Sequence, residues 1–268
     1  MNSKAETNAA MTANQDNAAQ ETSVKGEYAL VGDLKMYYEI HGTGPPLVLL
    51  HGAFMSATVY PTLAEGRQVI AVDLQGHGRT ADIDRPLTCE QMADDTAALL
   101  KQLKIDQTDV FGYSLGGKVG LALAIRHPEL VRRLAIFGAA YRSFEESFPP
   151  DVLKVFKEAT PETFAPKELK EPYEKMSPAP NWKGLAAKIL QSVRNFKGFS
   201  PEQMKAINAE VFISAGDHND VSLEDIVEMH KLITKSQLAV FPNTEHVVLM
   251  TNPDKVLVQV REFLNAQK

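Results

Sequence analysis

The sequence predicts an α/β protein built on a mostly parallel sheet of about eight strands, with helices on both faces and a small helical cap. Two observations support this fold class. Short apolar runs alternate with helix-like patterns along most of the chain, and the alternation stops between Tyr141 and Ser200, where the strand signal disappears. We therefore expect a core of residues 26–140 and 206–268, with residues 141–205 inserted as the cap.

The core elements are expected in the order in which the apolar runs occur. The first two strands, Tyr28–Val31 and Lys35–Ile40, should form a hairpin around Gly32 and Asp33. Further strands are expected near residues 47–50, 68–73, 108–113, 133–138, 210–215 and 237–241, and helices over 90–104, 118–126, 223–229 and 253–264. Ligands of such sheets bind beyond the carboxyl ends of the strands, so a site is expected in the loops that follow them.

The cap segment is rich in aromatic residues and prolines. It holds nine of the twenty aromatic residues of the chain and seven prolines, and helical patterns remain only at about 151–159 and 182–196. Two interpretations stay open: the aromatic side chains pack the cap onto the core, or a minority of them line an apolar pocket. The charged residues of this segment are typical of a solvated face, so a neutral substrate is expected; they are Glu145, Glu146, Lys154 and Lys157.

Composition is typical of an ordinary enzyme. The net charge of −6 without a basic cluster argues against nucleic acid or an anionic membrane as a partner, and no apolar run approaches the length of a membrane span. The single cysteine, Cys89, excludes an intramolecular disulfide and is expected to be structural. No metal-ligand spacing or phosphate-binding loop is found, so no metal or cofactor is predicted. We expect a monomer or homodimer that acts on a small molecule.

Residues 1–25 form a separate segment. They are rich in Ala, Asn, Gln and Thr and contain no aromatic residue, so a disordered tail is predicted. The segment lacks the apolar stretch of a secretory signal, which favours a cytoplasmic location. A periplasmic or secreted protein stays possible if a signal was removed before the tail.

A candidate nucleophile lies in the segment Val110–Gly116. An apolar run is followed by the pattern G-x-S-x-G and then by a helix-like stretch, the arrangement that places a serine on a tight turn between a strand and a helix. The pattern predicts that Ser114 is exposed at this turn, and that Gly112 and Gly116 are needed because a β-carbon would clash where strand and helix nearly touch. The backbone N–H of Leu115, at the start of the helix, could hydrogen-bond a developing oxyanion.

Two other loops supply candidate partners. The strand Pro46–Leu50 leads into a loop where Ala53 is expected to donate the second oxyanion N–H, and Phe54 is expected to shape the floor of the pocket. Tyr113, next to the serine, is a further pocket candidate. His246 follows the last strand and is expected to reach Ser114, whereas the other histidines need no catalytic role.

Taken together, these segments resemble the α/β-hydrolase superfamily, and in particular its small bacterial esterase-like branch. The resemblance runs from about Tyr28 to Leu264. Its landmarks are Tyr37–Gly42, the His51-Gly52 loop, Asp73–Gly78, the serine turn and the pair Glu245-His246. It implies that Ser114 is the nucleophile, that His246 is the general base and then the general acid, and that Ala53 and Leu115 are the oxyanion donors.

The acidic member of the triad departs from the family pattern. The family commonly places its acid three residues after the glycine of the strand end, and Asn219 stands there in this chain, between Asp217 and Asp220. We predict that a one-residue slip in the turn brings Asp220 into the position. Asp217 is the alternative acid, or it ties down the loop. If Asn219 itself occupies the position, it can accept a hydrogen bond from His246 but cannot stabilise the imidazolium by charge.

The activity expected from these residues is hydrolysis of a carboxylic ester or lactone of a small to medium, largely apolar substrate through an acyl-enzyme. Carbon–carbon bond hydrolysis or perhydrolysis on the same fold is the alternative, because a serine at this turn also supports those reactions. An alternative of another class is a catalytically impaired relative that only binds a ligand, which Asn219 would favour.

Overall fold

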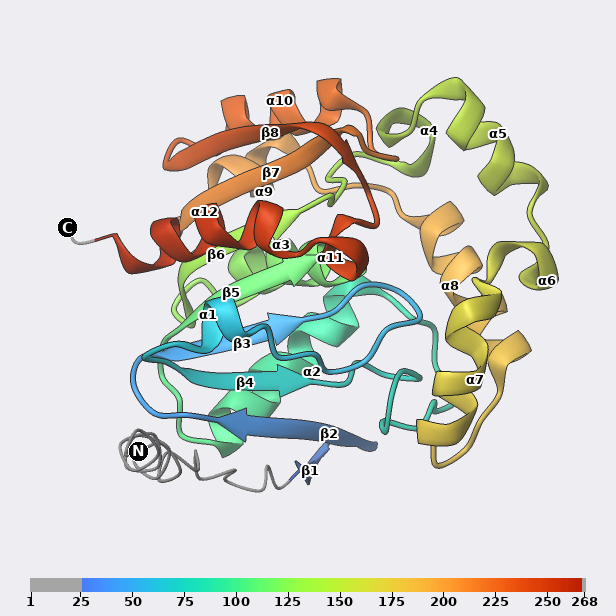
Figure 1. Ribbon diagram of the computed structural model, residues 1–268, viewed down its shortest axis with the longest axis horizontal. Helices are drawn as coiled ribbons and strands as arrows, with labels where there is room; N and C mark the ends of the chain where they lie inside the picture. Colours follow the sequence, from blue (N-terminus) through green and yellow to red (C-terminus); the bar gives the residue numbers. More distant parts are fainter. Residues whose placement is uncertain (1–25, 267–268) are drawn as a thin grey trace, which may run out of the picture.

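The computed structural model describes residues 26–266 (Figure 1). The tail predicted for residues 1–25 lies outside the described residues. The described chain forms one eight-stranded sheet in the order β1-β2-β4-β3-β5-β6-β7-β8. The strands are β1 Gly26–Val31, β2 Leu34–His41, β3 Pro46–Leu50, β4 Gln68–Val72, β5 Thr108–Tyr113, β6 Val131–Phe137, β7 Glu210–His218 and β8 Ser236–Glu245.

The predicted fold class is confirmed. β1 and β2 form the expected antiparallel hairpin, and β2 also runs antiparallel to β4, while all other neighbouring strands are parallel. The carboxyl ends of the parallel strands therefore lie at one edge of the sheet. This edge is where the candidate residues of the sequence analysis come together.

Both faces of the sheet are covered by helices, because the strands are apolar on both sides. In β3, Val48 and Leu50 point into one core cluster and Leu47 and Leu49 into the other, as the alternation of a strand requires. The first face is covered by α2 Cys89–Gln102, α3 Leu115–Arg126 and α10 Leu223–Leu232, and the second by α1 Pro61–Ala64, α11 Val248–Thr251 and α12 Asp254–Asn265. All core side chains in β3 are at most 4% exposed.

A layer of helices lies between β6 and β7 in the chain. It consists of α4 Phe144–Ser147, α5 Pro150–Glu158, α6 Pro161–Phe164, α7 Lys167–Met176 and α8 Trp182–Asn195, followed by α9 Pro201–Lys205, which packs against α10. In Figure 1 the helices α5 to α8 stand beyond the ends toward which the parallel strands point. The sequence indicated only α5 and α8, since α4 and α6 are four residues long and α7 contains Pro172 and few apolar residues.

The start of this layer is attached to the core by a buried carboxylate. Asp225 of α10 is fully buried and accepts hydrogen bonds from the backbone N–H groups of Tyr141 and Arg142, at 3.0 and 3.2 Å. The Arg142 guanidinium and the Ser147 hydroxyl also donate to Asp225. Because a buried charge is stable only when it is paired and hydrogen-bonded, this cluster holds the first turn of the cap at one place on the core.

Candidate active site

The serine turn has the strained geometry that the sequence predicted. Ser114 has φ 53° and ψ −111°, between the end of β5 and the first residue of α3. A β-carbon at Gly112 would lie 2.4 Å from the carbonyl oxygen of Gly116, and one at Gly116 would lie 2.1 Å from that of Leu50. Only glycine fits at these two positions, so strand and helix approach closely enough to lift the serine out of the sheet.

His246 reaches the serine from the loop that follows β8. Its Nε2 lies 2.9 Å from Oγ of Ser114, a hydrogen-bond distance. The hydroxyl of Tyr113 donates to the carbonyl oxygen of His246 at 2.9 Å, and the two rings lie 5.4 Å apart. The residue before the serine therefore helps to hold the histidine in place, an interaction that the sequence analysis did not foresee.

The partner of His246 on its other side is Asn219. Oδ1 of Asn219 lies 2.6 Å from Nδ1 of His246, and Nδ2 of the same amide donates to the carbonyl oxygen of Val221 at 3.3 Å. Since Nδ2 is engaged by a carbonyl, the oxygen faces the histidine, so Nδ1 carries the proton and the lone pair of Nε2 faces Ser114. Ser114, His246 and Asn219 thus form a hydrogen-bonded series in which an amide stands where an acid was expected.

The prediction that Asp220 slips into this position is wrong for this structure. His218 pairs with Glu245 in the parallel register of β7 and β8, so the next residue along each strand, Asn219 and His246, come side by side. Asp217, the alternative acid, is turned away and accepts the backbone N–H groups of Asn243 and Thr244, both at 2.9 Å. It ties down the loop, the second role considered for it.

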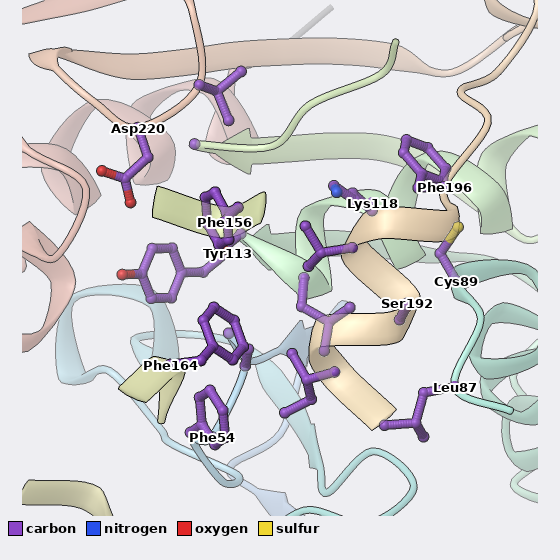
Figure 2. A pocket seen from close by; sticks show the side chains of 18 of the residues that line it. Phe54, Leu87, Cys89, Tyr113, Lys118, Phe156, Phe164, Ser192, Phe196 and Asp220 are labelled. Atoms are coloured by element: carbon purple, nitrogen blue, oxygen red, sulfur yellow. The ribbon is translucent and has the colours of Figure 1, made fainter. Parts of the chain in front are cut away.

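Asp220 nevertheless lies close enough to influence the histidine. Its side chain lines the same cavity and stands beside Tyr113 in Figure 2. Burial lowers the pKa of His246 below its usual value; the Asp220 carboxylate raises that pKa and the Lys118 ammonium lowers it. Asp220 therefore acts on His246 through space, without a hydrogen bond.

Gly138, just after β6, provides room for the pair His246 and Asn219. It has φ +66°, and a β-carbon there would lie 2.9 Å from Nδ1 and Cε1 of His246 and 3.1 Å from Oδ1 of Asn219. A side chain at this position would both strain the backbone and push the pair apart. The sequence analysis did not single out this glycine, because its role depends on residues about 80 and 110 positions away.

The two predicted oxyanion donors lie beside the serine. Leu115 is the first residue of α3, so its N–H has no partner within the helix, and Ala53 lies in the turn closed by the hydrogen bond from Met55 N–H to the Gly52 carbonyl. Neither N–H donates a hydrogen bond to the residues that the structure describes. Both residues line the cavity next to Ser114 and are available to a ligand there.

A cavity of about 530 Å³ opens above Ser114 between the core and the cap. Phe54 and Tyr113 are among the residues that line it, and Phe54 also packs against Trp182 and Phe164 with ring centroids 5.0 and 5.6 Å apart. In Figure 2, Phe54, Tyr113, Phe156 and Phe164 lie on one side of the cavity, and Phe196 lies on the other side near Lys118. The aromatic lining contributed by the cap consists of Phe148, Phe156, Phe164 and Phe196.

Two residues that line the cavity were not predicted from the sequence to belong to the site. Cys89, expected to be structural, is buried but lines the cavity, and burial raises the pKa of its thiol to about 12. Lys118, treated as part of the helix after the turn, also lines it. Both come from α2 and α3, far from the loops where the sequence analysis looked, and α8 closes the cavity over them (Figure 2).

Two buried histidines support the loops around the site. His51 lies with Nδ1 2.7 Å from the Gly52 carbonyl and Nε2 3.1 Å from the Leu74 N–H, and His77 lies with Nδ1 2.9 Å from the Gln75 carbonyl. Burial lowers the pKa of His51 to about 4 and that of His77 to about 3. Within residues 26–266, no group of three His, Cys, Asp or Glu side chains is arranged to hold a metal ion. The helices of this part are all too short or too polar to cross a membrane.

The sequence model of the alpha/beta hydrolase family matches residues 47–260. The chain belongs to this family. One similar relative is the 2-hydroxy-6-oxo-2,4-heptadienoate hydrolase of Pseudomonas putida, 31% identical over 270 aligned positions that cover 90% of this chain and 97% of that protein.

Solved structures of the same fold include enzymes of different activity. A meta-cleavage product hydrolase from Pseudomonas fluorescens IP01 has a TM-score of 0.73 at 23% identity, and the alignment covers 90% of this chain and 97% of that enzyme's chain. A thermophilic esterase from Thermogutta terrifontis has a TM-score of 0.70 at 24% identity, and the alignment covers 90% of this chain and 98% of the esterase chain. This hydrolase thus shares its fold with enzymes that are named for different reactions.

Proposed function

We propose that this hydrolase cleaves a carboxylic ester of a small to medium, largely apolar substrate through an acyl-enzyme. The observation that carries the proposal is the contact of 2.9 Å between Ser114 Oγ and His246 Nε2 beneath a largely apolar cavity. A hydroxyl that faces a neutral imidazole lone pair can give up its proton as it attacks a carbonyl.

The steps follow from the positions of these groups. Ser114 Oγ attacks the ester carbonyl carbon while its proton passes to Nε2 of His246, and the N–H groups of Ala53 and Leu115 stabilise the oxyanion that forms. The imidazolium then gives its proton to the leaving alkoxide. A water molecule, deprotonated by the same nitrogen, attacks the acyl-enzyme and releases the acid and Ser114.

Asn219 favours an ester over a more demanding bond. An amide orients His246 but cannot stabilise the imidazolium by charge, so the histidine is a weaker base and its conjugate acid is less stable than in a triad with a carboxylate. An alkoxide leaves more easily than a carbanion. Cleavage of an ester therefore needs a less strongly basic histidine than cleavage of a carbon–carbon bond.

Carbon–carbon bond hydrolysis is the second candidate function. It is favoured by the 31% identity, over nearly the whole length of both chains, to the 2-hydroxy-6-oxo-2,4-heptadienoate hydrolase. The same serine, histidine and oxyanion donors would form an acyl-enzyme in this reaction, with a carbon leaving group in place of the alkoxide.

Initial rates on p-nitrophenyl butyrate and on 2-hydroxy-6-oxo-2,4-heptadienoate, measured side by side at neutral pH, separate the two functions. We expect turnover of the ester that disappears in the Ser114→Ala variant. A kcat/KM higher on the dienoate than on the ester would favour the second candidate. Ester turnover that survives in Ser114→Ala would contradict both, because the serine would not be the nucleophile.

A further inference from the structure

The active-site cavity contains an ammonium group that has no anionic partner. Lys118 lies in the first turn of α3, four residues after Ser114. Both line the cavity. In Figure 2 the Lys118 amine lies beside Phe196 and Cys89, well separated from Asp220 and Tyr113.

The other lysines of the cavity are engaged or exposed. Lys188 forms an ion pair of 2.6 Å with Asp82 and donates to the carbonyl oxygens of Ile83 and Arg85, and Lys197 is exposed. The ammonium of Lys118 forms no hydrogen bond and no ion pair with any residue in 26–266. The ammonium lies over the Phe196 ring, whose centroid is 4.6 Å from Nζ.

No carboxylate of the described residues forms an ion pair with Lys118: Glu90 also lines the cavity, but it accepts from the Cys89 thiol at 3.3 Å. The Cys89 thiol is protonated, since burial raises its pKa to about 12. Asp225 acts on Lys118 only at a distance, because its oxygens already accept from Tyr141, Arg142 and Ser147. A partly buried ammonium without a partner carries a desolvation penalty that an anionic ligand would relieve.

We infer that Lys118 binds a carboxylate carried by the substrate, so that this enzyme acts on esters of an otherwise apolar molecule that ends in an anionic group. The inference rests on the proposed function for the bond that is cleaved, but not for the binding of the anion. Ser114 and Lys118 line one cavity of about 530 Å³, so a chain of a few carbon atoms can join the carboxylate at Lys118 to the carbonyl at Ser114. In this arrangement the apolar side chains of the cavity contact the body of the substrate, and the ammonium of Lys118 binds its anionic end.

Matched esters test the inference. Monomethyl adipate and methyl hexanoate differ only in that a carboxylate replaces a terminal methyl group, and 5-acetoxypentanoate and pentyl acetate make the same comparison on the alcohol side. We expect kcat/KM to favour the anionic member of at least one pair by about 10-fold or more, in line with the strength of a charge-assisted hydrogen bond. Lys118→Met should remove this preference. The preference is measured as the ratio of kcat/KM between the two members of a pair within each variant, because the Lys118 charge also lowers the pKa of His246 and its loss affects both members alike.

Two variants serve as controls. Lys118→Arg keeps the charge and should retain most of the preference for the anionic ester. Lys205→Met removes an exposed charge on α9, outside the cavity, and should leave the preference unchanged. An anionic-to-neutral ratio in both pairs that is the same in Lys118→Met as in the original protein would overturn the inference.

Binding without turnover separates this inference from the proposed function. Calorimetric titration of Ser114→Ala with monomethyl adipate and with 5-acetoxypentanoate should give a Kd that rises about 10-fold or more, for at least one of them, when Lys118→Met is added. If the original protein hydrolyses no ester but this difference remains, the proposed function fails and the anion site stands. If hydrolysis occurs but neither Kd depends on Lys118, the anion site fails alone.

Thermal unfolding distinguishes a binding lysine from a structural one. Removing an ammonium that lacks a partner also removes its desolvation penalty, so Lys118→Met should have a Tm equal to or above that of the original protein. A lower Tm together with an unchanged preference among the esters would mean that Lys118 only supports the fold, and the inference would be wrong.

Discussion

Asn219 places its side-chain oxygen 2.6 Å from Nδ1 of His246, in the position where a serine hydrolase of this fold commonly has a carboxylate. The amide orients the ring as a carboxylate would, because it accepts the Nδ1 proton and leaves Nε2 free for Ser114. What it cannot supply is negative charge for the imidazolium that forms during catalysis. The relationship between these two residues therefore governs how strong a base the enzyme has.

Replacing the amide with an acid should increase activity. We expect Asn219→Asp to raise kcat/KM for ester hydrolysis by between about 10-fold and about 10⁴-fold, the upper value being the loss caused by the reverse change in another serine hydrolase triad. Steady-state rates on p-nitrophenyl butyrate measure it. Asn219→Ala removes the hydrogen bond to His246, and its kcat/KM should be lower than that of the original protein. An Asn219→Asp variant no faster than the original would mean that Asp220 already supplies the charge.

The pH dependence of kcat/KM should show a histidine that stays neutral in mild acid. Burial lowers the pKa of His246 below the ordinary 6.5, and the base is active only when neutral, so activity rises with pH and the midpoint of this rise lies below 6.5. Asp220→Asn removes the charge that raises this pKa and should move the acid limb to lower pH. Values of kcat/KM between pH 4.5 and 8 define the acid limb of the original protein and of Asp220→Asn. A midpoint above pH 6.5 in the original protein would contradict this view of the site.

Gly138→Ala should damage the site more than the fold. The new methyl group would lie 2.9 Å from His246 and 3.1 Å from Asn219, so the pair must move, and we expect kcat/KM to fall by about 10²-fold. Gly32→Ala is the matched control: Gly32 has φ +58°, close to the +66° of Gly138, but no atom lies within 4 Å of its added β-carbon. Both variants should lose stability, by about 1 kcal/mol for Gly32→Ala. An equal loss of activity in the two would show that backbone strain alone is responsible.

Stability should fall in acid because of the buried histidines. The pKa values of His51 and His77 are about 4 and about 3 in the folded protein, below the ordinary 6.5. Below pH 6.5 the two histidines therefore bind protons in the unfolded chain but stay neutral in the folded one. Their contribution is complete above pH 6.5 and is lost as the pH falls toward 4, at up to about 1.4 kcal/mol per pH unit for each histidine.

Urea unfolding at pH 7 and pH 5 measures this loss. The free energy of unfolding of His77→Gln should change less between the two pH values than that of the original protein, whatever the absolute stability of the variant. His127→Gln is the control, because His127 is half-buried and paired with Asp94 at 2.8 Å. The same pH difference in His77→Gln as in the original protein would contradict the assignment.

The serine turn and the positions of the strands along the chain could be predicted from the sequence because their causes are local. The elbow depends on seven consecutive residues, Val110–Gly116, in which the glycines permit a close approach of strand and helix. The central strands β3, β4 and β5 are apolar runs that are buried on both faces, and each predicted run became a strand. The short cap helices α4 and α6 were missed because four residues carry no periodicity.

Which of three neighbouring residues meets His246 depended on contacts between distant parts of the chain. A shift of one residue between β7 and β8 would exchange Asn219 for Asp220, and nothing within residues 216–220 determines that register. The structure decides it through the pairing of His218 with Glu245 and the hydrogen bonds that hold Asp217.

The sequence by itself determined the fold class and pointed to the serine and histidine, since short segments with strong local preferences determine these features. Only the tertiary structure decided that Asn219 partners His246, that Gly138 makes room for the pair, and that Lys118 faces the cavity without an anion. These three facts arise where β6, β7, β8, α3 and α8 meet, and the proximity of side chains so far apart in the chain is a property of packing.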